Sequence, residues 1–479
     1  MDSRYAPVTE PFSHRALRDG TVAAISQSGD HVFLSAHELA LLRERPSALP
    51  LNLQAALKAR FFLKDPRAQG MRTLLRSRIA AKRETVTVGP SLHILVPTLQ
   101  CAHSCRYCQV SRALSSAGFS MTEADIDRAC DTILQSPAPV LTVEFQGGDP
   151  LIRFDLIQRA VLRLVGSPDL NGRRLRFVIA STLHQLDEAM CDFMKSHGIL
   201  LSTSLDGPES LHDRNRPTPS RDAYRKTMAG VALARRRLGE DAVSALMTTT
   251  KASLEQPEAI VDEYVQRGFR DLFIRPLSSY GFAKRNPTRL AYSQDEFREF
   301  YGRALDRVLH WNRQGVALRE VYASIILNKL LSPFDAGYVD LQSPTGAGSS
   351  VLVYNYDGYV YPSDEARMLV ETGDRSLRIG RIGTSLSDLQ KSPVLEALRQ
   401  ASLVDSIAEC SRCAYRLFCA PNPVDAQAQF GNLNAPVAAT EHCQRHLWLF
   451  DLFLQYLHDA DAWQLDLFHA WAAPVGIEA

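Results

Sequence analysis

Two groups of cysteines are the residues of this sequence whose spacing points most directly to chemistry. The first group has the spacing C-x3-C-x2-C and consists of Cys101, Cys105 and Cys108. A cubane iron–sulfur cluster has four irons, normally all held by protein thiolates, so three thiolates without an obvious fourth would leave one iron open. An open iron can bind a small molecule through an amine and a carboxylate. The alternative is a zinc site, for which His103 could supply the missing ligand.

The second group has the spacing C-x2-C-x5-C-x23-C and consists of Cys410, Cys413, Cys419 and Cys443. Four thiolates complete the coordination of either an iron–sulfur cluster or a zinc ion, so both remain open on spacing alone. A closed site of this kind would transfer electrons or hold the fold without binding substrate directly. Cys130 and Cys191 fall inside helical patterns and are interpreted as buried packing residues.

Two short polar motifs each follow a candidate strand. Residues 146–150 read Gln-Gly-Gly-Asp-Pro, and residues 204–208 read Ser-Leu-Asp-Gly-Pro. The glycine pair allows close backbone approach to a ligand, and the carboxylate of Asp149 can pair with an ammonium group. Ser204 and Asp206 share one face because side chains alternate along a strand, and their oxygens suit hydrogen bonds to a ribose.

The elements that must position these residues alternate between strands and helices. Apolar runs predict strands at residues 92–96, 140–145, 176–180, 200–205, 243–249 and 272–275. Amphipathic stretches predict helices near residues 122–136, 153–165, 185–197, 222–238 and 254–268. This alternation indicates an α/β fold with a parallel sheet and helices outside. Six units are too few for a closed eight-stranded barrel, so we predict a partial (β/α)6 TIM-like barrel with its site at the carboxyl ends of the strands.

A small α+β unit is predicted before the barrel, over residues 1–85. It contains strands at 21–26 and 31–34, and Ser35 and Glu38 form a capping box at the start of a helix. The basic stretch 72–83 then leads into the barrel as a helix or a linker.

The barrel domain is predicted to span residues 90–315 and a C-terminal domain residues 316–479. Residues 294–335 read as mostly helical, and Asp357-Gly358 marks the turn of a β-hairpin. The second cysteine group then lies in loop-like sequence, before an apolar helix at 442–458.

The composition excludes several classes of partner. The 479 residues carry 54 Lys and Arg against 53 Asp and Glu, a net charge of +1, which offers no basic surface for nucleic acid or an anionic membrane. The N-terminus is polar and no run of about 18 apolar residues occurs, so we expect no signal peptide and no membrane span. We predict a cytoplasmic protein, in which clustered cysteines bind metal more often than they form disulfides.

The segments C-x3-C-x-Y-C, QGG-D-P and SLDGP followed by LHDRNRP resemble the radical S-adenosylmethionine (SAM) enzymes that modify peptides. The resemblance covers roughly residues 90–450. It implies a [4Fe–4S] cluster on Cys101, Cys105 and Cys108 whose open iron binds the methionyl amine and carboxylate of SAM. In that family an electron from the cluster cleaves the C–S bond, and the released 5′-deoxyadenosyl radical abstracts a substrate hydrogen.

The same resemblance implies the contacts to SAM. Tyr107 matches the residue beside the adenine, and Ser204 and Asp206 match the ribose and carboxylate contacts. The segment that holds the methionyl amine corresponds to Gln146, Gly147, Gly148 and Asp149. The family usually has Glu where this chain has Asp149, and we expect the shorter carboxylate to keep its contact.

The C-terminal region is similar to the auxiliary-cluster extension known as SPASM. The four residues that match the ligands of its outer cluster are Cys410, Cys413, Cys419 and Cys443. Thr345, Ser363 and Pro423 stand where the family has cysteines for the inner cluster. Because all three losses affect the inner cluster, we predict one auxiliary [4Fe–4S] cluster in place of two, with a zinc site as the alternative.

Two residues near the substrate cavity of such relatives are candidates for roles with substrate. Asp364 follows Ser363 in a hairpin that faces the cavity, where it could act as a general base, or it could be a solvated carboxylate. Arg275, at the end of the last predicted barrel strand, could pair with a peptide carboxylate or carbonyl, or with a structural partner.

Within this branch the chain most resembles the His-Xaa-Ser repeat system maturases. The match rests on LHILVPTLQCAHSCRYCQVSR, LTVEFQGGDPL, VSALMTTT and LFIRPLSSYGFA, and on the C-terminal C-x2-C-x5-C followed by Pro423-Val424. It implies a small ribosomally made precursor peptide as substrate and a second radical SAM maturase as partner, and we expect an electron donor such as flavodoxin or ferredoxin. The N-terminal unit over residues 1–85 is loosely similar to the peptide-recognition domains fused to other maturases, which implies that it recognises the peptide. The product stays open, since a crosslink, an epimerisation and a dehydrogenation all begin with the same hydrogen abstraction.

Two other functions compete with this one. A sulfatase-type maturase would oxidise one Ser or Cys of a protein, but those relatives carry both auxiliary clusters. A non-catalytic iron–sulfur or zinc scaffold would present a peptide to a partner enzyme, but it would not need Gly147, Gly148, Asp149 and Asp206.

Overall fold

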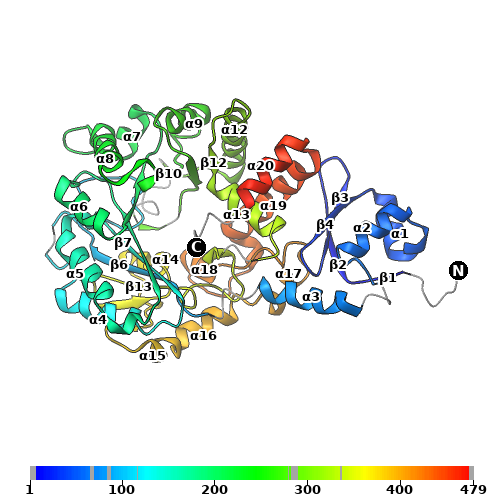
Figure 1. Ribbon diagram of the computed structural model, residues 1–479, viewed down its shortest axis with the longest axis horizontal. Helices are drawn as coiled ribbons and strands as arrows, with labels where there is room; N and C mark the ends of the chain where they lie inside the picture. The colour runs from blue at the N-terminus through cyan, green and yellow to red at the C-terminus, as the bar shows by residue number, and fades with distance from the viewer. Residues whose placement is uncertain are drawn as a thin grey trace.

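The computed structural model describes residues 7–64, 69–82, 88–115, 117–278, 280–281, 290–334 and 337–473. A twisted sheet with helices on its outer face forms the larger part of the molecule, and a small unit lies at the opposite end (Figure 1). The C-terminal helices lie between these two parts. Among the described residues, no helix is both long and apolar enough to cross a bilayer.

The main sheet contains the barrel strands in the order β12-β11-β10-β9-β8-β7-β6-β13-β14-β15. Its parallel strands are β6 (Leu92–Thr98), β7 (Val140–Gly147), β8 (Arg174–Ala180), β9 (Leu200–Ser204), β10 (Val243–Thr248), β11 (Asp271–Arg275), β12 (Arg319–Glu320) and β13 (Val351–Tyr354). Two antiparallel strands, β14 (Tyr359–Tyr361) and β15 (Gly380–Arg381), complete it. The predicted α/β partial barrel is confirmed, and its six strands lie where the apolar runs place them.

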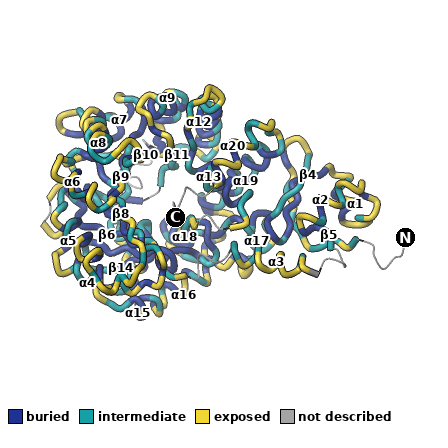
Figure 2. Tube along the Cα trace, viewed as in Figure 1, coloured by how far each residue is buried: buried dark blue, intermediate teal, exposed yellow. Residues whose placement is uncertain are grey.

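Alternation along β7 shows how the sequence sets the two faces of this sheet. Leu141, Val143 and Phe145 are fully buried beneath the outer helices, whereas Glu144 and Gln146 point into the barrel and are only partly buried. The buried core follows the sheet and the inner faces of the helices (Figure 2).

The outer helices of the barrel are α4 (Glu123–Ile133), α5 (Phe154–Val165), α6 (Glu188–Ser196), α7 (Glu209–Asn215), α8 (Ala223–Leu238), α9 (Pro257–Gln266) and α12 (Gln294–Arg313). Capping boxes begin two of them, with Thr122 and Asp125 at α4 and Ser293 and Glu296 at α12. Such caps satisfy backbone donors that the first turn leaves free.

The N-terminal unit has its own small core of buried aliphatic residues and Phe62. It consists of β1 (Val8–Thr9), β2 (Phe12–Ala16), β3 (Val22–Ser26), β4 (His31–Leu34), α1 (Ala36–Glu44), α2 (Leu51–Ala59), β5 (Leu63–Lys64) and α3 (Gln69–Ala81). The predicted capping box of Ser35 and Glu38 is confirmed at α1. The basic stretch forms a helix, α3, whose Arg78 pairs with Asp30 at 2.7 Å.

The remaining helices follow the barrel in the chain. They are α13 (Val321–Leu331), α14 (Asp364–Met368), α15 (Leu386–Gln390), α16 (Pro393–Gln400), α17 (Ala408–Ser411), α18 (Pro423–Phe430), α19 (Glu441–Asp459) and α20 (Ala462–Ala472). β12 and β13 extend the barrel sheet, so the region after residue 315 is continuous with it. The exact domain bounds therefore stay predictions.

Candidate functional site

The first cysteine group, the glycine pair and Ser204 meet around one hollow at the carboxyl ends of the barrel strands. The hollow has a volume of about 240 Å³, and its lining includes Cys101, Cys105, Cys108, Tyr107, Gln146, Gly147, Gly148 and Ser204. Parallel strands bring their carboxyl ends to one edge, which is why motifs far apart in sequence converge here. Asp149 and Asp206 are the two predicted SAM contacts that do not line it.

The loop after β6 that carries the three thiols is held by its backbone. The Ser104 N–H donates to the Pro217 carbonyl at 2.8 Å, and the Arg106 N–H donates to the Asn215 carbonyl at 3.2 Å. These bonds join the cysteine loop to the segment that follows α7. The loop therefore has a defined place relative to the strand ends.

The thiols of this group are free and partly buried. Burial raises the pKa of Cys105 to about 12, although Arg216 nearby opposes that rise, and Cys101 has its pKa raised by burial, by Asp149 and by Cys105. Thiolates at these positions need a cation to compensate their charge, as a cluster would provide. In the described part of the chain, no three His, Cys, Asp or Glu side chains are arranged to hold a metal ion as they stand.

The glycine pair is required by close packing between β7 and the cysteine loop. A Cβ on Gly147 would lie 2.1 Å from the Thr98 carbonyl oxygen, and one on Gly148 would lie 2.2 Å from that of Leu99. Gly147 also has a φ of 140°, which favours glycine. These residues therefore shape the loop as well as leaving room for a ligand.

The carboxylate of Asp149 contacts groups within the protein, whereas the sequence predicts a contact with a ligand ammonium group. It is fully buried and accepts hydrogen bonds from the hydroxyls of Ser181, at 2.6 Å, and Thr182. Its Oδ1 also accepts the Leu151 N–H at 3.3 Å. The carboxylate thus ties the end of β7 to the end of β8, and its contact with a ligand stays a prediction.

Asp206 is likewise fully buried behind the hollow. The Tyr107 hydroxyl lies 2.9 and 2.7 Å from its two carboxylate oxygens, and Arg216 Nε lies 3.1 Å from Oδ2. Tyr107 and Arg216 line the hollow themselves. Arg216 belongs to the LHDRNRP motif but was not predicted as a site residue. No position in the motif alone indicates that its guanidinium reaches the cavity.

His103, the alternative zinc ligand, has a different partner. Its Nε2 lies 2.9 Å from Nε2 of His184, and burial lowers the pKa of both rings. Its backbone N–H donates to Cys101 Sγ at 3.4 Å. The side chain therefore supports the cysteine loop through His184.

The lining of the hollow also includes Glu144, Arg275 and Asp364, which together are called its far part here. Arg367 Nε donates to Asp364 Oδ1 at 2.7 Å, and Gln146 Nε2 donates to Glu144 Oε1 at 3.0 Å. Burial raises the pKa of Glu144. Sequence reasoning missed Glu144, although its place two residues before Gln146 on a strand puts both on one face.

The positions without inner-cluster cysteines have structural tasks. The Ser363 hydroxyl accepts the Ala366 N–H at 3.2 Å and caps α14. Pro423 occupies the first turn of α18, and the Thr345 hydroxyl accepts the Ala347 N–H at 3.2 Å. Each replacement is therefore suited to the local backbone.

The second cysteine group gathers between α17 and the start of α19, and its thiols are free. Burial raises the pKa of Cys410 to about 12, with further increases from Cys443 and Cys413. Burial raises the Cys419 pKa, and the charges of Cys413, Cys443 and Cys410 raise it further. This donor set fits a four-thiolate site.

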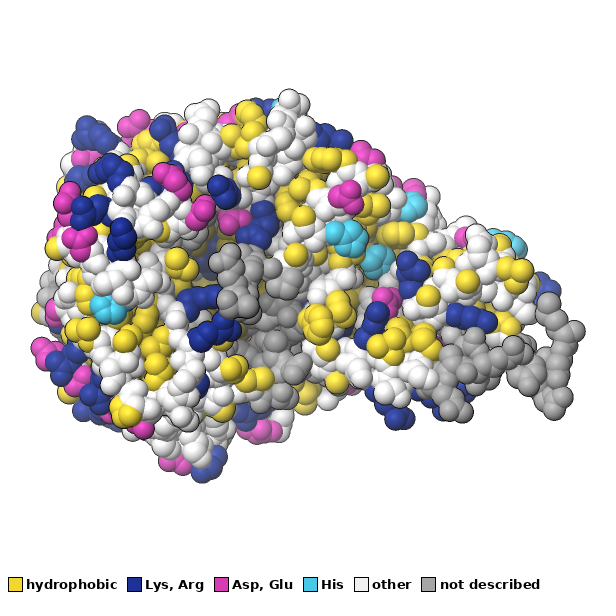
Figure 3. Space-filling view, in the orientation of Figure 1, with side chains coloured by type: hydrophobic (Ala, Val, Ile, Leu, Met, Phe, Trp, Pro, Cys, Tyr) yellow, Lys and Arg dark blue, Asp and Glu magenta, His cyan; other side chains and the backbone are white. Residues whose placement is uncertain are grey.

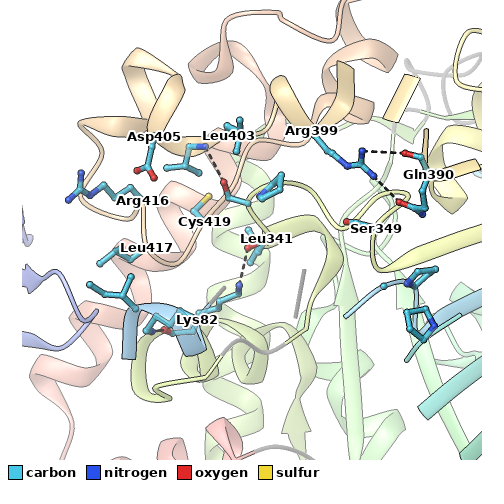
Figure 4. A pocket seen from close by; sticks show the side chains of 18 of the residues that line it. Lys82, Leu341, Ser349, Gln390, Arg399, Leu403, Asp405, Arg416, Leu417 and Cys419 are labelled. Carbon is cyan, nitrogen blue, oxygen red and sulfur yellow. Dashed lines mark hydrogen bonds between the residues drawn. The ribbon is translucent and has the colours of Figure 1, made fainter. Parts of the chain in front are cut away.

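A larger cavity of about 790 Å³ lies beside this group, between α3, the amino ends of the barrel strands and the C-terminal region (Figure 4). Cys419, Arg416 and Lys82 line one side of it, and Arg399 donates to Gln390 Oε1 at 2.8 Å on the other. On the face seen in Figure 3, acidic and basic side chains are interspersed, in line with the near-zero net charge.

Comparison with known proteins identifies the barrel. The model of the radical SAM superfamily matches residues 95–268. A serine-type anaerobic sulfatase-maturating enzyme of Klebsiella pneumoniae is 24% identical over 335 residues, which cover 68% of this chain and 80% of the relative.

Solved structures share the fold at low sequence identity. Native anSMEcpe with bound AdoMet has a TM-score of 0.64 and 15% identity, over 79% of this chain and 99% of the other. Streptococcus suis SuiB bound to precursor peptide SuiA has a TM-score of 0.54 and 13% identity, over 91% of this chain and 100% of the other. The predicted resemblance to radical SAM enzymes that modify peptides is confirmed: residues 95–268 carry a radical SAM domain, and the chain is related to maturases of this superfamily. The narrower resemblance to His-Xaa-Ser repeat maturases stays a prediction.

Proposed function

We propose that this enzyme abstracts a hydrogen from a small ribosomally made precursor peptide, of the His-Xaa-Ser repeat type, and so installs a modification such as a crosslink. The observation that carries the proposal is the single hollow in which three free thiols, the glycine pair and a polar far end meet.

Residues around the near part of the hollow are suited to the cofactors. Cys101, Cys105 and Cys108 would hold a [4Fe–4S] cluster with an open iron. When bound, the cluster and SAM would supply a 5′-deoxyadenosyl radical. The Tyr107 ring would lie beside the adenine, and Ser204 would hydrogen-bond the ribose.

Arg216 is suited to the methionyl carboxylate of SAM. Its ion pair with Asp206 runs through Nε, which leaves the two terminal amino groups for a bidentate contact. The proposed contact with the methionyl amine of SAM lies at residues 146–149, at the carboxyl end of β7.

The far part of the hollow would receive the substrate residue. Asp364 would accept a proton from it, held in place by Arg367. Arg275 lines the same hollow, where its charge opposes the rise in the pKa of Glu144, and its guanidinium would bind a peptide carbonyl or carboxylate.

The second cysteine group would hold one auxiliary [4Fe–4S] cluster, with a zinc ion as the alternative. The structural tasks of Thr345, Ser363 and Pro423 support the absence of an inner cluster. Cys419 borders the larger cavity, which offers a route toward an electron donor such as flavodoxin or ferredoxin.

A sulfatase-type maturase is the second candidate, favoured by the Klebsiella relative. The similarity to SuiB bound to precursor peptide SuiA favours a precursor peptide as substrate. This similarity covers 91% of the chain and therefore includes part of the N-terminal unit, which we predict to recognise the peptide.

The test of enzymatic activity begins with anaerobic reconstitution of the protein with iron and sulfide. SAM and dithionite are then added, and the 5′-deoxyadenosine formed is measured by mass spectrometry. We expect product from the natural chain and none from a Cys101→Ala variant. Adding a His-Xaa-Ser repeat peptide should give a peptide mass shift, whereas a shift only on a sulfatase-derived Ser or Cys peptide would favour the second candidate. Absence of 5′-deoxyadenosine under strong reduction would refute both candidate functions.

A further inference from the structure

Behind the hollow, three buried polar side chains from separate segments form one connected group. Tyr107 comes from the cysteine loop, Asp206 from the end of β9, and Arg216 from the segment after α7. The Tyr107 hydroxyl contacts both Asp206 oxygens, and Arg216 Nε lies 3.1 Å from the second of them. The guanidinium also lies over the Tyr107 ring, 5.2 Å from its centre. Each member therefore contacts the other two.

Two further elements hold Asp206, one through its carboxylate and one through its backbone N–H. The Thr248 N–H on β10 donates to Asp206 Oδ1 at 3.4 Å, and the Asp206 N–H donates to His212 Nδ1 on α7 at 3.3 Å. Asp206 has no exposed surface, whereas both of its charged or hydroxyl partners line the hollow. Tyr107, Arg216 and Thr248 all contact this carboxylate and line the hollow, so they connect it to a ligand bound there.

Backbone bonds connect the same segments. Ser104 and Arg106 in the cysteine loop donate to the carbonyls of Pro217 and Asn215, the residues on either side of Arg216. The side-chain group and these two bonds hold the loop between Cys105 and Cys108 against the strand ends.

We infer that Asp206 is a positioning residue that latches the cysteine loop to the barrel and so pre-forms the SAM site before the cluster is loaded. This differs from a direct contact between Asp206 and the ribose or carboxylate of SAM. The inference rests on the proposed use of the hollow for SAM. A buried ion pair that loses one partner leaves the other charge uncompensated, so the latch should be sensitive to single substitutions.

Hydrogen–deuterium exchange of the cluster-free chain tests the latch. We expect Asp206→Asn to speed exchange in residues 101–112 at least about tenfold, because Arg216 loses its counter-charge. Tyr107→Phe keeps every charge and should give a smaller increase in the same segment. Asp271→Asn breaks the Asp271–Arg319 pair (2.8 Å) at the other end of β11 and should leave that segment unchanged.

Equilibrium dialysis of SAM against the reconstituted protein gives the second measurement, with the thermal midpoint as a check on folding. Asp206→Asn should raise the Kd for SAM at least about tenfold, while Asp271→Asn should not. A weaker Kd without faster loop exchange would mean direct contact and would overturn the positioning role. If Asp206→Asn changes neither the exchange of residues 101–112 nor the Kd for SAM, the latch is refuted. If Asp206→Asn does not fold, the same two measurements on Tyr107→Phe decide. A natural chain that fails to bind SAM would instead refute the proposed function.

Discussion

Replacing Gly148 by alanine should displace the cysteine loop by a predictable amount. The added Cβ would stand 2.2 Å from the Leu99 carbonyl oxygen and 2.4 Å from that of Gln100, whereas ordinary contacts begin at 3.4 Å. Both obstacles are backbone atoms, so the loop and the end of β7 must separate by about 1 Å. Gly148 does not have a positive φ, so the backbone conformation itself suits alanine.

The displacement should affect activity more than stability. Overpacking of this kind costs about 1–3 kcal/mol, which for a chain of 479 residues that unfolds as one unit corresponds to a fall in Tm of about 1–3 °C. A shift of about 1 Å between reacting groups can lower a rate roughly 100-fold. The measurements are thermal unfolding of the cluster-free chain, the iron content after reconstitution, and the rate of 5′-deoxyadenosine formation.

Gly302→Ala is the matched control. Gly302 lies within α12, and an added Cβ there would have no heavy atom within 4 Å. Alanine should stabilise that helix by up to about 1 kcal/mol and leave the iron content and rate unchanged. If Gly148→Ala cleaves SAM at the natural rate with full iron content, the close packing of β7 on the cysteine loop does not control the site.

Three further substitutions probe other parts of the molecule. Glu320 is fully buried and has its pKa raised by burial from 4.5 to about 7, so its folded form keeps a proton that the unfolded chain releases. The contribution of this group to the free energy of unfolding therefore falls as pH rises between those values. In urea unfolding, the natural chain should lose about 2 kcal/mol of stability between pH 5 and pH 7 relative to the Glu320→Gln variant. Asp364→Asn should reduce peptide modification at least tenfold without changing peptide-free 5′-deoxyadenosine formation, and equal loss in both assays would contradict its role as base. Cys413→Ala should lower the iron content from about eight to about four per chain while Cys130→Ala leaves it unchanged, and a natural chain with about four irons and one zinc would favour the alternative metal.

The barrel was predictable from the sequence because its signals are local. Each apolar run of four to seven residues is followed by a helical stretch, and the six runs coincide with β6 to β11. The elements missed are those whose pattern is weak or short. β2 (FSHRA) is mostly polar, and α20 begins directly after α19, with Ala460 and Asp461 between them.

The orientation of the two acidic motif residues was not predictable from their own segments. Asp149 turns toward Ser181 and Thr182, which follow a different strand, and Asp206 turns toward a tyrosine from the cysteine loop. Both carboxylates lie just past a strand end, where alternation no longer determines direction. Only partners far away in the sequence decide which way such a side chain faces.

The glycine pair and Asp206 act on the cysteine loop at two different points. Before the first cysteine, the Gly147 and Gly148 backbone packs directly against the carbonyls of Thr98 and Leu99, and between the second and third cysteines Tyr107 is hydrogen-bonded to the buried carboxylate. A motif residue in this site can therefore be essential without touching SAM, because moving the loop moves the thiols and Tyr107 together. Loss of SAM cleavage in a variant does not by itself identify a ligand contact. Measuring loop exchange in the cluster-free chain separates the residues that shape the site from those that bind within it.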